Sequence, residues 1–453
     1  NRTGGILINF IKPWTAVLSI LLVTGCSAKT QSSDNTQSKN ESAAQEQTSN
    51  TTSPEDTNTR TLSGTYTDPL VIDTSGQVIL TLSNADLESI DIRNADQATI
   101  ILEGTNTISE TSIGAVNEED ANAAIYADCP ITFQGEGSLS VHAQSNHAIY
   151  SKDTIEIDSG TYEIQCANDG IKGKDGVTVN AGKIHIDSGD HGIASTKNKD
   201  KEYGSVRING GTISIDAQGD GIHCTGNVQV NGEELTISSQ QEGIEGQTLT
   251  LTGGLNTITA ADDGLNASDP DSTTDEGMDP FASTSSNCAI VISGGQNTIT
   301  AAGDGIDSNG SLTVSGGTTF VSGPENGGNF ALDYDTDGVF EGGMLLACGM
   351  SGMVQTLTSS SPSIAIATDR SKDTNITLEQ NGRSVLSFKA SHAFDTLLVY
   401  DSGFQTGDEV CILDETITLS DGQNTIGNVQ SMNSGLPGQP MGGGPQNGRR
   451  PGR

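Results

Sequence analysis

A repeat of 21 or 22 residues runs through the middle of this chain and constrains its fold more than any other feature. Each copy contains a step in which small and polar residues lead to an aliphatic one. Successive steps are separated by 24, 22, 22, 29, 22, 21 and 41 residues, so some copies carry insertions. The aliphatic residues of the steps are Ile125, Ile149, Ile171, Ile193, Ile222, Ile244, Leu265 and Ile306.

Each period also contains two further short runs in which apolar and polar residues alternate, for example 177–179 and 184–186. Alternation of this kind is typical of strands, and the Gly- and Asn-rich steps between runs are typical of turns. One period is therefore a coil of three short strands, and stacked coils bury their inward residues together. The repeat predicts an all-β chain with a right-handed parallel β-helix over residues 61–335. A leucine-rich repeat has a similar period, but its Leu-rich pattern is absent.

The ends of the chain differ in composition from the repeats. The repeat weakens after Pro324, and runs such as 364–366, 376–378 and 397–400 predict a small β-rich cap over residues 336–430. Residues 26–60 are almost all polar and are expected to form a disordered tether. Residues 431–453 are rich in Gly and Pro and are expected to form a flexible tail.

Residues 1–25 have the features of a signal peptide. A short apolar stretch over 14–23 follows Arg2 and Lys12 and is too short to span a bilayer stably. It ends in Leu-Val-Thr-Gly-Cys26, which resembles the lipobox of bacterial lipoproteins. That resemblance implies lipidation of Cys26 and a location on the extracellular face of the cell membrane. A plain signal peptide with a chance cysteine is the alternative. The six later cysteines are compatible with disulfides or with buried thiols.

The formal charge of −37 limits the partners of this chain. Nucleic acid is excluded as a partner because phosphate binding needs clustered Lys and Arg. An acidic polysaccharide is compatible only if a cation lies between the two negative surfaces.

Two positions of the repeat collect acidic side chains near its end. The turn column lies two residues before the aliphatic residue, and the face column lies one residue after it. In the last three coils, the two columns and Asp262, which precedes the turn column, hold six carboxylates and one amide. These residues are Glu242, Glu245, Asp262, Asp263, Asn266, Asp304 and Asp307. Like charges on adjacent coils repel, and oxygen-only ligands favour calcium. The alternative is that Asp-Gly simply suits a turn with positive φ, which explains the turn column but not the face column.

A long insertion, residues 268–287, follows one acidic coil and is itself acidic. It is expected either to fold over the cation site or to be a solvated loop.

Several motifs resemble a family of secreted, clostridial-type, carbohydrate-binding β-helix lipoproteins. These motifs are Gly303-Asp304-Gly305-Ile306-Asp307, the run 323–335 and the run 347–353. The family is similar in fold to the calcium-dependent family 9 pectate lyases. The resemblance implies bound Ca²⁺ and affinity for plant polysaccharide, including pectic chains. Asp262-Asp263-Gly264-Leu265-Asn266 matches the calcium motif of the lyases except for Asn at its last place.

Three functions remain open from the sequence. The preferred one is calcium-dependent, non-catalytic binding of polygalacturonate or cellulose, with Tyr126 and Tyr150 stacking on sugar rings or serving only as a structural ladder. The second is a polyuronate lyase acting by β-elimination, with Lys172 as the base. Lys172 lies three coils from Glu245, roughly 15 Å away, which is long for one subsite. The third is a surface adhesin or structural protein.

Overall fold

The computed structural model describes residues 58–111, 123–199, 202–271 and 287–429. Within these ranges every regular element is a strand, and most neighbouring strands are parallel. The prediction of an all-β chain is confirmed for the described residues. The predicted signal peptide, Cys26, most of the tether and the tail lie outside them.

The aliphatic steps of the repeat form one parallel ladder of strands, here called the first ladder. Ile149 pairs with Ile171 and Ile171 with Ile193, so equivalent residues of successive repeats lie side by side. Its members are β2 (Leu70–Asp73), β4 (Ile90–Arg93), β7 (Ala123–Ala127), β10 (His147–Ser151), β13 (Ile171–Gly173), β16 (Ile193–Ser195), β21 (Ile222–Cys224), β24 (Ile244–Gly246), β27 (Leu265–Ala267), β29 (Ile306–Ser308) and β31 (Leu332–Tyr334).

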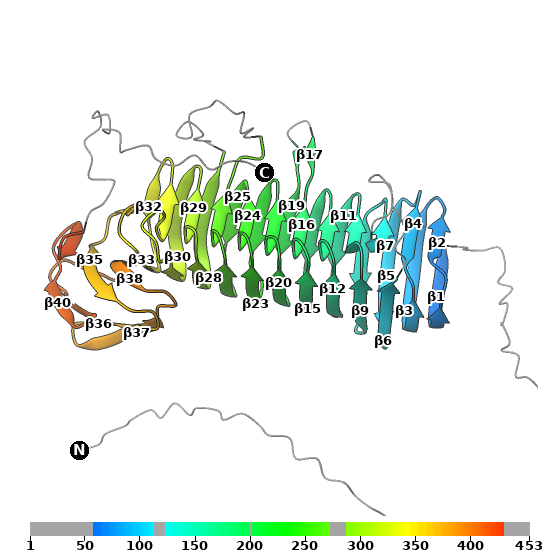
Figure 1. Cartoon of the computed structure of the whole chain (residues 1–453), viewed down its shortest axis with the longest axis horizontal. Coiled ribbons are helices and arrows are strands. Elements are labelled where there is room, and N and C mark those ends of the chain that lie inside the picture. The colour runs from blue at the N-terminus through cyan, green and yellow to red at the C-terminus, as the bar shows by residue number, and fades with distance from the viewer. Residues whose placement is uncertain (1–57, 112–122, 200–201, 272–286, 430–453) are drawn as a thin grey trace, which may run out of the picture. The chain divides into compact units, whose positions relative to one another are not determined.

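The other two runs of each repeat form a second and a third parallel ladder within one large sheet (Figure 1). The second ladder holds β5 (Gln97–Glu103), β8 (Ile131–Gln134), β11 (Thr154–Ile157), β14 (Gly176–Val179), β19 (Ser205–Ile208), β22 (Asn227–Val230), β25 (Thr248–Leu251), β32 (Gly338–Phe340) and β34 (Thr358–Ser359). The third holds β6 (Thr105–Glu110), β9 (Ser138–Ala143), β12 (Thr161–Cys166), β15 (Lys183–Ser188), β20 (Thr212–Ala217), β23 (Glu234–Ser239), β26 (Leu255–Ala260) and β33 (Met344–Gly349). Four long strands run through both: β1 (Thr59–Tyr66), β3 (Gln77–Leu87), β28 (Ala289–Ala301) and β30 (Ser311–Ser322).

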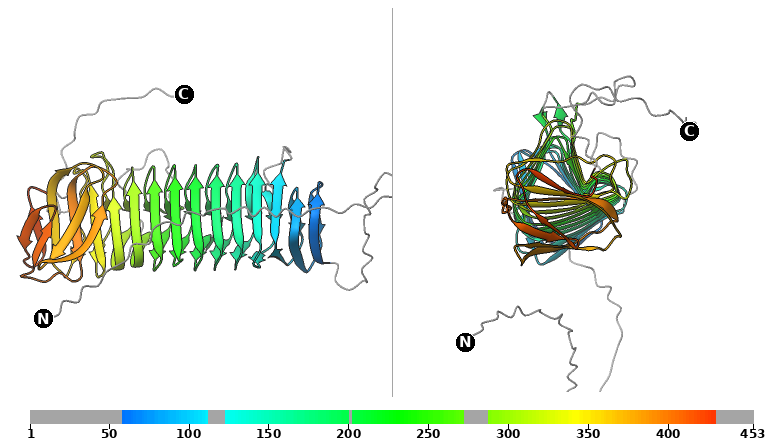
Figure 2. Two further views of the ribbon diagram at one scale, coloured as in Figure 1. Left: turned by 90° about the horizontal axis from the view of Figure 1, so that it is seen from below. Right: turned by 90° about the vertical axis from the view of Figure 1, so that its left-hand side faces the viewer.

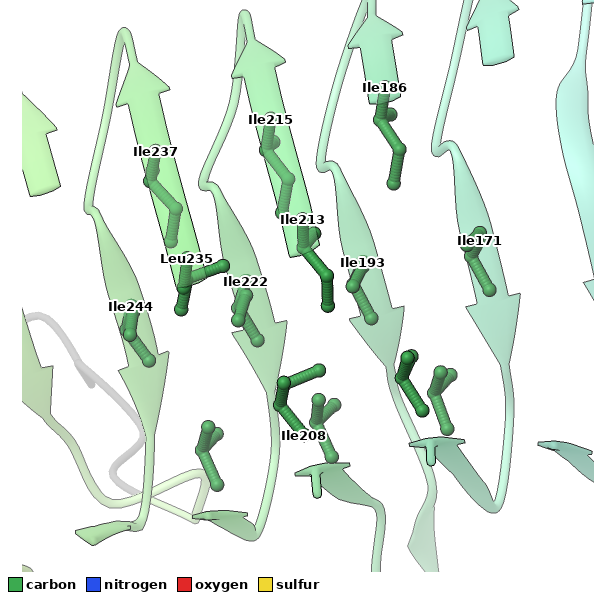
Figure 3. Packing of buried hydrophobic residues seen from close by; sticks show 14 of the residues in the cluster. Ile171, Ile186, Ile193, Ile208, Ile213, Ile215, Ile222, Leu235, Ile237 and Ile244 are labelled. Atoms are coloured by element: carbon green, nitrogen blue, oxygen red, sulfur yellow. The ribbon is translucent and has the colours of Figure 1, made fainter. Parts of the chain in front are cut away.

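We call these three ladders together the stack. Its coils lie side by side in both views of the ribbon (Figures 1 and 2). In most strands of the stack, alternate residues point inward and are buried, as the alternation in the sequence predicts. Figure 3 shows the inward residues of the first ladder, Ile171, Ile193, Ile222 and Ile244, in successive coils. Burying each such side chain contributes about 1.5–3 kcal/mol relative to exposure, so stacking is what stabilises the coils.

The glycines before the aliphatic residues are required by close packing between coils. A Cβ placed on Gly264 would lie 2.5 Å from the carbonyl oxygen of Gly305 and would also collide with Ile299. Gly221 and Gly192 face the next coil in the same way. None of these glycines has a positive φ. The interpretation of Asp-Gly as a positive-φ turn is therefore wrong, and the close approach of the next coil selects glycine instead.

The parallel ladders continue past residue 335, the end of the predicted β-helix. The strands β32 and β33 still pair in parallel with β30. In the large sheet, antiparallel pairing begins where β38 (Phe394–Asp401) joins β33 and β35 (Ser363–Arg370). The strand β41 (Gln423–Ile426) then pairs with β35.

A four-stranded antiparallel sheet follows, made of β36 (Asn375–Gln380), β37 (Arg383–Lys389), β39 (Glu409–Ile412) and β40 (Glu415–Thr418). It packs on a second apolar cluster that includes Phe388, Phe394 and Leu397. A short hairpin of β17 (Asn198–Lys199) and β18 (Glu202–Tyr203) extends from one coil of the stack.

Candidate functional site

The turn column is a ladder of hydrogen bonds between coils. The carboxylate Oδ1 of Asp169 accepts the backbone N–H of His191 at 3.2 Å, and Nδ1 of His191 accepts the N–H of Asp220 at 3.0 Å. Nearer the end of the stack, Oδ1 of Asp304 accepts the N–H of the buried Phe330 at 2.6 Å. Asp263 accepts the N–H of Asp304 in the same way. Asp169, Asp263 and Asp304 therefore each use one carboxylate oxygen in a structural role, which leaves the second oxygen available.

In the early coils that second oxygen faces a basic side chain. Oδ2 of Asp169 lies 2.8 Å from Nζ of Lys172 and 3.2 Å from Nδ1 of His147. Burial alone raises the pKa of Asp169, but these two partners lower it well below its ordinary value. The charge of this coil is thus balanced within the protein.

In the middle coils, histidine side chains lie against the acidic groups. Oδ2 of Asp220 lies 2.8 Å from Nδ1 of His223 and 3.4 Å from Nδ1 of His191. Nδ1 of His223 also lies 2.8 Å from Oε2 of Glu245. Burial, together with the neighbouring Asp220, raises the pKa of Glu242 to about 8. Glu242 and Glu245, predicted as calcium ligands, thus lie beside His223 and Asp220.

The last coils hold buried acids without basic partners. Burial, reinforced by repulsion between neighbouring acids, raises the pKa of Asp263 to about 6, of Asp304 to about 7 and of Asp307 to about 8. Among the described residues, the ion pairs along these two columns end at Glu245. The acids beyond it are therefore in a position where a bound cation would favour their ionised form.

The predicted ligands do not form one set. Asp307 pairs in register with Asn266 in the first ladder, and Asp263 lies next to Asp304 through the turn column. Asp262 is exposed and acts on Asp263 through its charge. Among the described residues, the acids of the last coils are not one of the groups whose ligand atoms all lie within 4.8 Å of one another.

The first ladder has one more strand after Ile306 than the repeat predicted. Leu332 continues the ladder after Ile306, which places Asp333 in the face column beside Asp307. Burial and the charge of Asp335 raise the pKa of Asp333. Ala331 precedes the aliphatic residue here, as Ala124 and Ala148 do in the first two steps of the repeat, so this step fits the same pattern. The pattern Phe-Ala-Leu-Asp with small residues upstream was the signal that would have found it.

The two predicted sugar-stacking residues form an edge-to-face pair with ring centroids 5.7 Å apart. Tyr126 is only 3% exposed, so its ring offers no face to a sugar, which corrects the stacking hypothesis for this residue. Tyr150 is partly exposed. Lys172, the candidate base, lies 5.9 Å from the centroid of the Tyr150 ring while its nitrogen contacts Asp169.

The described part of the long insertion lies against the hairpin. The hydroxyl of Tyr203 donates a hydrogen bond of 2.7 Å to Asp271, and the side-chain nitrogen of Asn198 donates to the carbonyl of Pro270. An open cavity of about 220 Å³ lies between these segments and the face column, where His223 and Glu245 line it. Residues 272–286 lie outside the described part of the chain.

The six cysteines in the described ranges form no disulfides. They are Cys129, Cys166, Cys224, Cys288, Cys348 and Cys411. No helix long and apolar enough to cross a membrane occurs in the described part of the chain.

Comparisons with known proteins place the repeats in a family. No curated protein matches the chain. A solved structure, a polysaccharide lyase-like protein from C. thermocellum in a gadolinium derivative, is 27% identical with a TM-score of 0.40; the match covers 43% of this chain and 84% of that one. The family model described as carbohydrate-binding domain-containing protein matches residues 45–327, more than half of the 453 residues. The chain therefore belongs to the carbohydrate-binding domain-containing protein family.

Proposed function

We propose that this chain binds polysaccharide through Ca²⁺ held by the acidic coils at the end of the stack, without catalysing a reaction. Membership of a carbohydrate-binding family supports polysaccharide as the ligand. One observation supports calcium binding. Asp263, Asp304 and Asp307 are largely buried, have raised pKa values and have no basic partner among the described residues.

We also infer that the stack is a right-handed parallel β-helix. The support is the in-register parallel pairing of equivalent residues in all three ladders. Nearly all crossovers between parallel strands of one sheet are right-handed. A helix of this kind presents the turn and face columns as one continuous strip, on which an extended polymer has room to lie.

The donor set fits calcium better than other common cations. Asp263, Asp304, Asp307 and Asp333 offer only carboxylate oxygens, with the amide of Asn266 beside them, and calcium takes six to eight oxygen ligands. An ion here would offset the repulsion that raises these pKa values. Coordination positions not filled by the protein would accept carboxylate or hydroxyl oxygens of a sugar. This reconciles a chain of net charge −37 with an acidic ligand such as polygalacturonate.

The geometry around Lys172 supports binding rather than β-elimination. Its nitrogen is engaged by Asp169 at 2.8 Å. In the first ladder, β13 lies five strands from β29, which carries Asp307. At the usual spacing between strands this is about 24 Å, too far for a base and a calcium ion to act on one sugar unit.

The proposed location rests on the sequence alone. Cleavage of residues 1–25 and lipidation of Cys26 would anchor the chain on the extracellular face of the membrane, with residues 26–60 as the tether. Mass spectrometry of the mature N-terminus in the native host tests this directly. A thioether-linked lipid on Cys26 supports the anchor, and an unmodified Cys26 removes it.

The function is tested by affinity electrophoresis in gels containing polygalacturonate or a soluble cellulose derivative, with calcium or with chelator. We expect calcium-dependent retardation of the full chain and no unsaturated product by ultraviolet absorbance. The double variant Asp304→Asn/Asp307→Asn should lose retardation. The variant Asp187→Asn/Asp216→Asn makes the same change of charge on the third ladder and should keep it.

Each other outcome removes a different part of the proposal. Equal retardation in chelator would remove calcium from the function. Appearance of unsaturated product would make the chain a lyase. Absence of retardation by either polymer, together with silence on a broader glycan array, would favour a surface adhesin.

A further inference from the structure

Side chains from three consecutive coils converge in the middle of the strip, away from the acidic coils. His191, Asp220 and His223 each offer one ligand atom, and all three atoms lie within 4.8 Å of one another. Both Nδ1 atoms face Oδ2 of Asp220, at 3.4 Å for His191 and 2.8 Å for His223. Oε2 of Glu245 lies 2.8 Å from Nδ1 of His223, on the next coil.

The fold itself produces this convergence. His191 and Asp220 occupy the turn column, whereas His223 and Glu245 occupy the face column. The parallel register places β16, β21 and β24 next to one another. The two imidazole rings stack with centroids 4.5 Å apart and planes inclined by 16°, so one ring must turn for both Nδ1 lone pairs to point at one ion.

The cluster concentrates negative charge that a cation would offset. The side chain of Asp220 is only 2% exposed, and Glu242 and Glu245 lie close by. Nδ1 of His223 lies 2.8 Å from a carboxylate oxygen of Asp220 and 2.8 Å from one of Glu245. One nitrogen of His223 therefore serves two carboxylates at once. A proton there can point toward only one of them, whereas a metal ion can bind both.

We propose that His191, Asp220, His223 and Glu245 form a second metal site, which takes a borderline divalent cation such as Zn²⁺ rather than calcium. Imidazole nitrogen suits zinc, copper and nickel, while calcium prefers oxygen alone. Zinc bonds of about 2.0–2.1 Å place neighbouring tetrahedral ligands about 3.3–3.4 Å apart. The 3.4 Å between His191 and Asp220 already has this value. The two contacts of His223 need to lengthen by about half an ångström to reach it.

An ion has a route to this site. The side chains of His191, His223 and Glu245 are 20%, 27% and 22% exposed. The open cavity of about 220 Å³ borders His223 and Glu245. It leaves room on that side for a water or a small ligand on the metal. Coordination by His191 replaces the hydrogen bond that its Nδ1 accepts from the backbone of Asp220.

The test is calorimetric titration of zinc chloride into the full chain, in buffer with excess calcium so that oxygen-only sites are already occupied. We expect a single zinc ion per chain. The variants His191→Gln and His223→Gln should each weaken binding by at least about tenfold. The matched control is His185→Gln, which removes a histidine 43% exposed on the third ladder and should bind as the wild type does.

Electron paramagnetic resonance of the copper-loaded chain gives a second readout that does not depend on the variants. Two nitrogen ligands are expected in the wild type and one in each variant that folds. A wild-type spectrum without two nitrogens, or zinc affinity unchanged in His223→Gln, overturns the proposal. Loss of binding in His191→Gln alone also overturns it, because it would place the ion with Asp169 and Asp190, which form the other convergent group.

Discussion

At the scale of single residues, the acids of the turn column do two things at once. Oδ1 of Asp304 accepts a backbone N–H from the next coil at 2.6 Å, and its pKa is nevertheless raised to about 7 by burial and by neighbouring acids. Asp169 makes the same kind of backbone bond, but Lys172 and His147 lower its pKa. The basic partners rather than the hydrogen bonds therefore separate structural acids from candidate metal ligands.

The two roles of Asp304 can be separated by substitution. Asp304→Ala leaves the N–H of the buried Phe330 without an acceptor and should destabilise the fold by about 1–3 kcal/mol. Asp304→Asn keeps an acceptor for this N–H. In chelator it should therefore lower the free energy of unfolding by less than Asp304→Ala does, while still weakening calcium binding. Denaturant unfolding of both variants in chelator measures this. Equal loss of stability in the two variants would contradict the structural role of the hydrogen bond.

The raised pKa of Asp307 predicts a pH dependence of stability. Between 3.8 and about 8, the native protein holds a proton that the unfolded chain has released. In chelator, stability should therefore fall as pH rises through that window and level off above it. Asp307→Asn should remove about 1–3 kcal/mol of this fall, measured by thermal unfolding at pH 5 and pH 8. If the stability of the wild type instead increased with pH across this window, burial would not act on Asp307 as described.

At the scale of the element, the stack is fixed by how closely its coils approach. The alternation in the sequence predicted strands and the faces they bury, since period-two patterns report which side of a strand is apolar. The reason for the repeated glycine was not predictable from one sequence. The contact of Gly264 with Gly305 and Ile299 exists only once neighbouring coils are stacked.

This packing predicts the effect of adding one methyl group. Gly264→Ala forces the Cβ against the backbone of the next coil and should destabilise the chain by about 1–3 kcal/mol. Gly328→Ala is the control, because Gly328 is exposed and its Cβ would meet only the side chain of Asn326. Thermal unfolding of the two variants side by side measures the difference. Equal melting temperatures would mean that the coils can separate at little cost.

At the scale of the whole chain, the sequence predicted the repeats better than the site. Local periodicity predicts the strands, so eight steps were placed correctly, whereas the step at Leu332, which lies 26 residues after Ile306, was missed. The column positions were also predictable, since every equivalent residue lies in register. The charge balance of each coil was not predictable, because it depends on contacts between side chains of neighbouring coils. Glu245 was predicted among the calcium ligands, yet it lies 2.8 Å from His223.

Calcium titration by calorimetry tests the central claim most directly. The full chain, stripped with chelator and then dialysed, is titrated with calcium chloride alongside Asp304→Asn/Asp307→Asn and the charge-matched Asp187→Asn/Asp216→Asn. We predict saturable binding by the wild type and the charge-matched control, and loss of at least one bound ion in the Asp304/Asp307 variant. Binding that is identical in all three proteins, or absent from the wild type, would contradict the account.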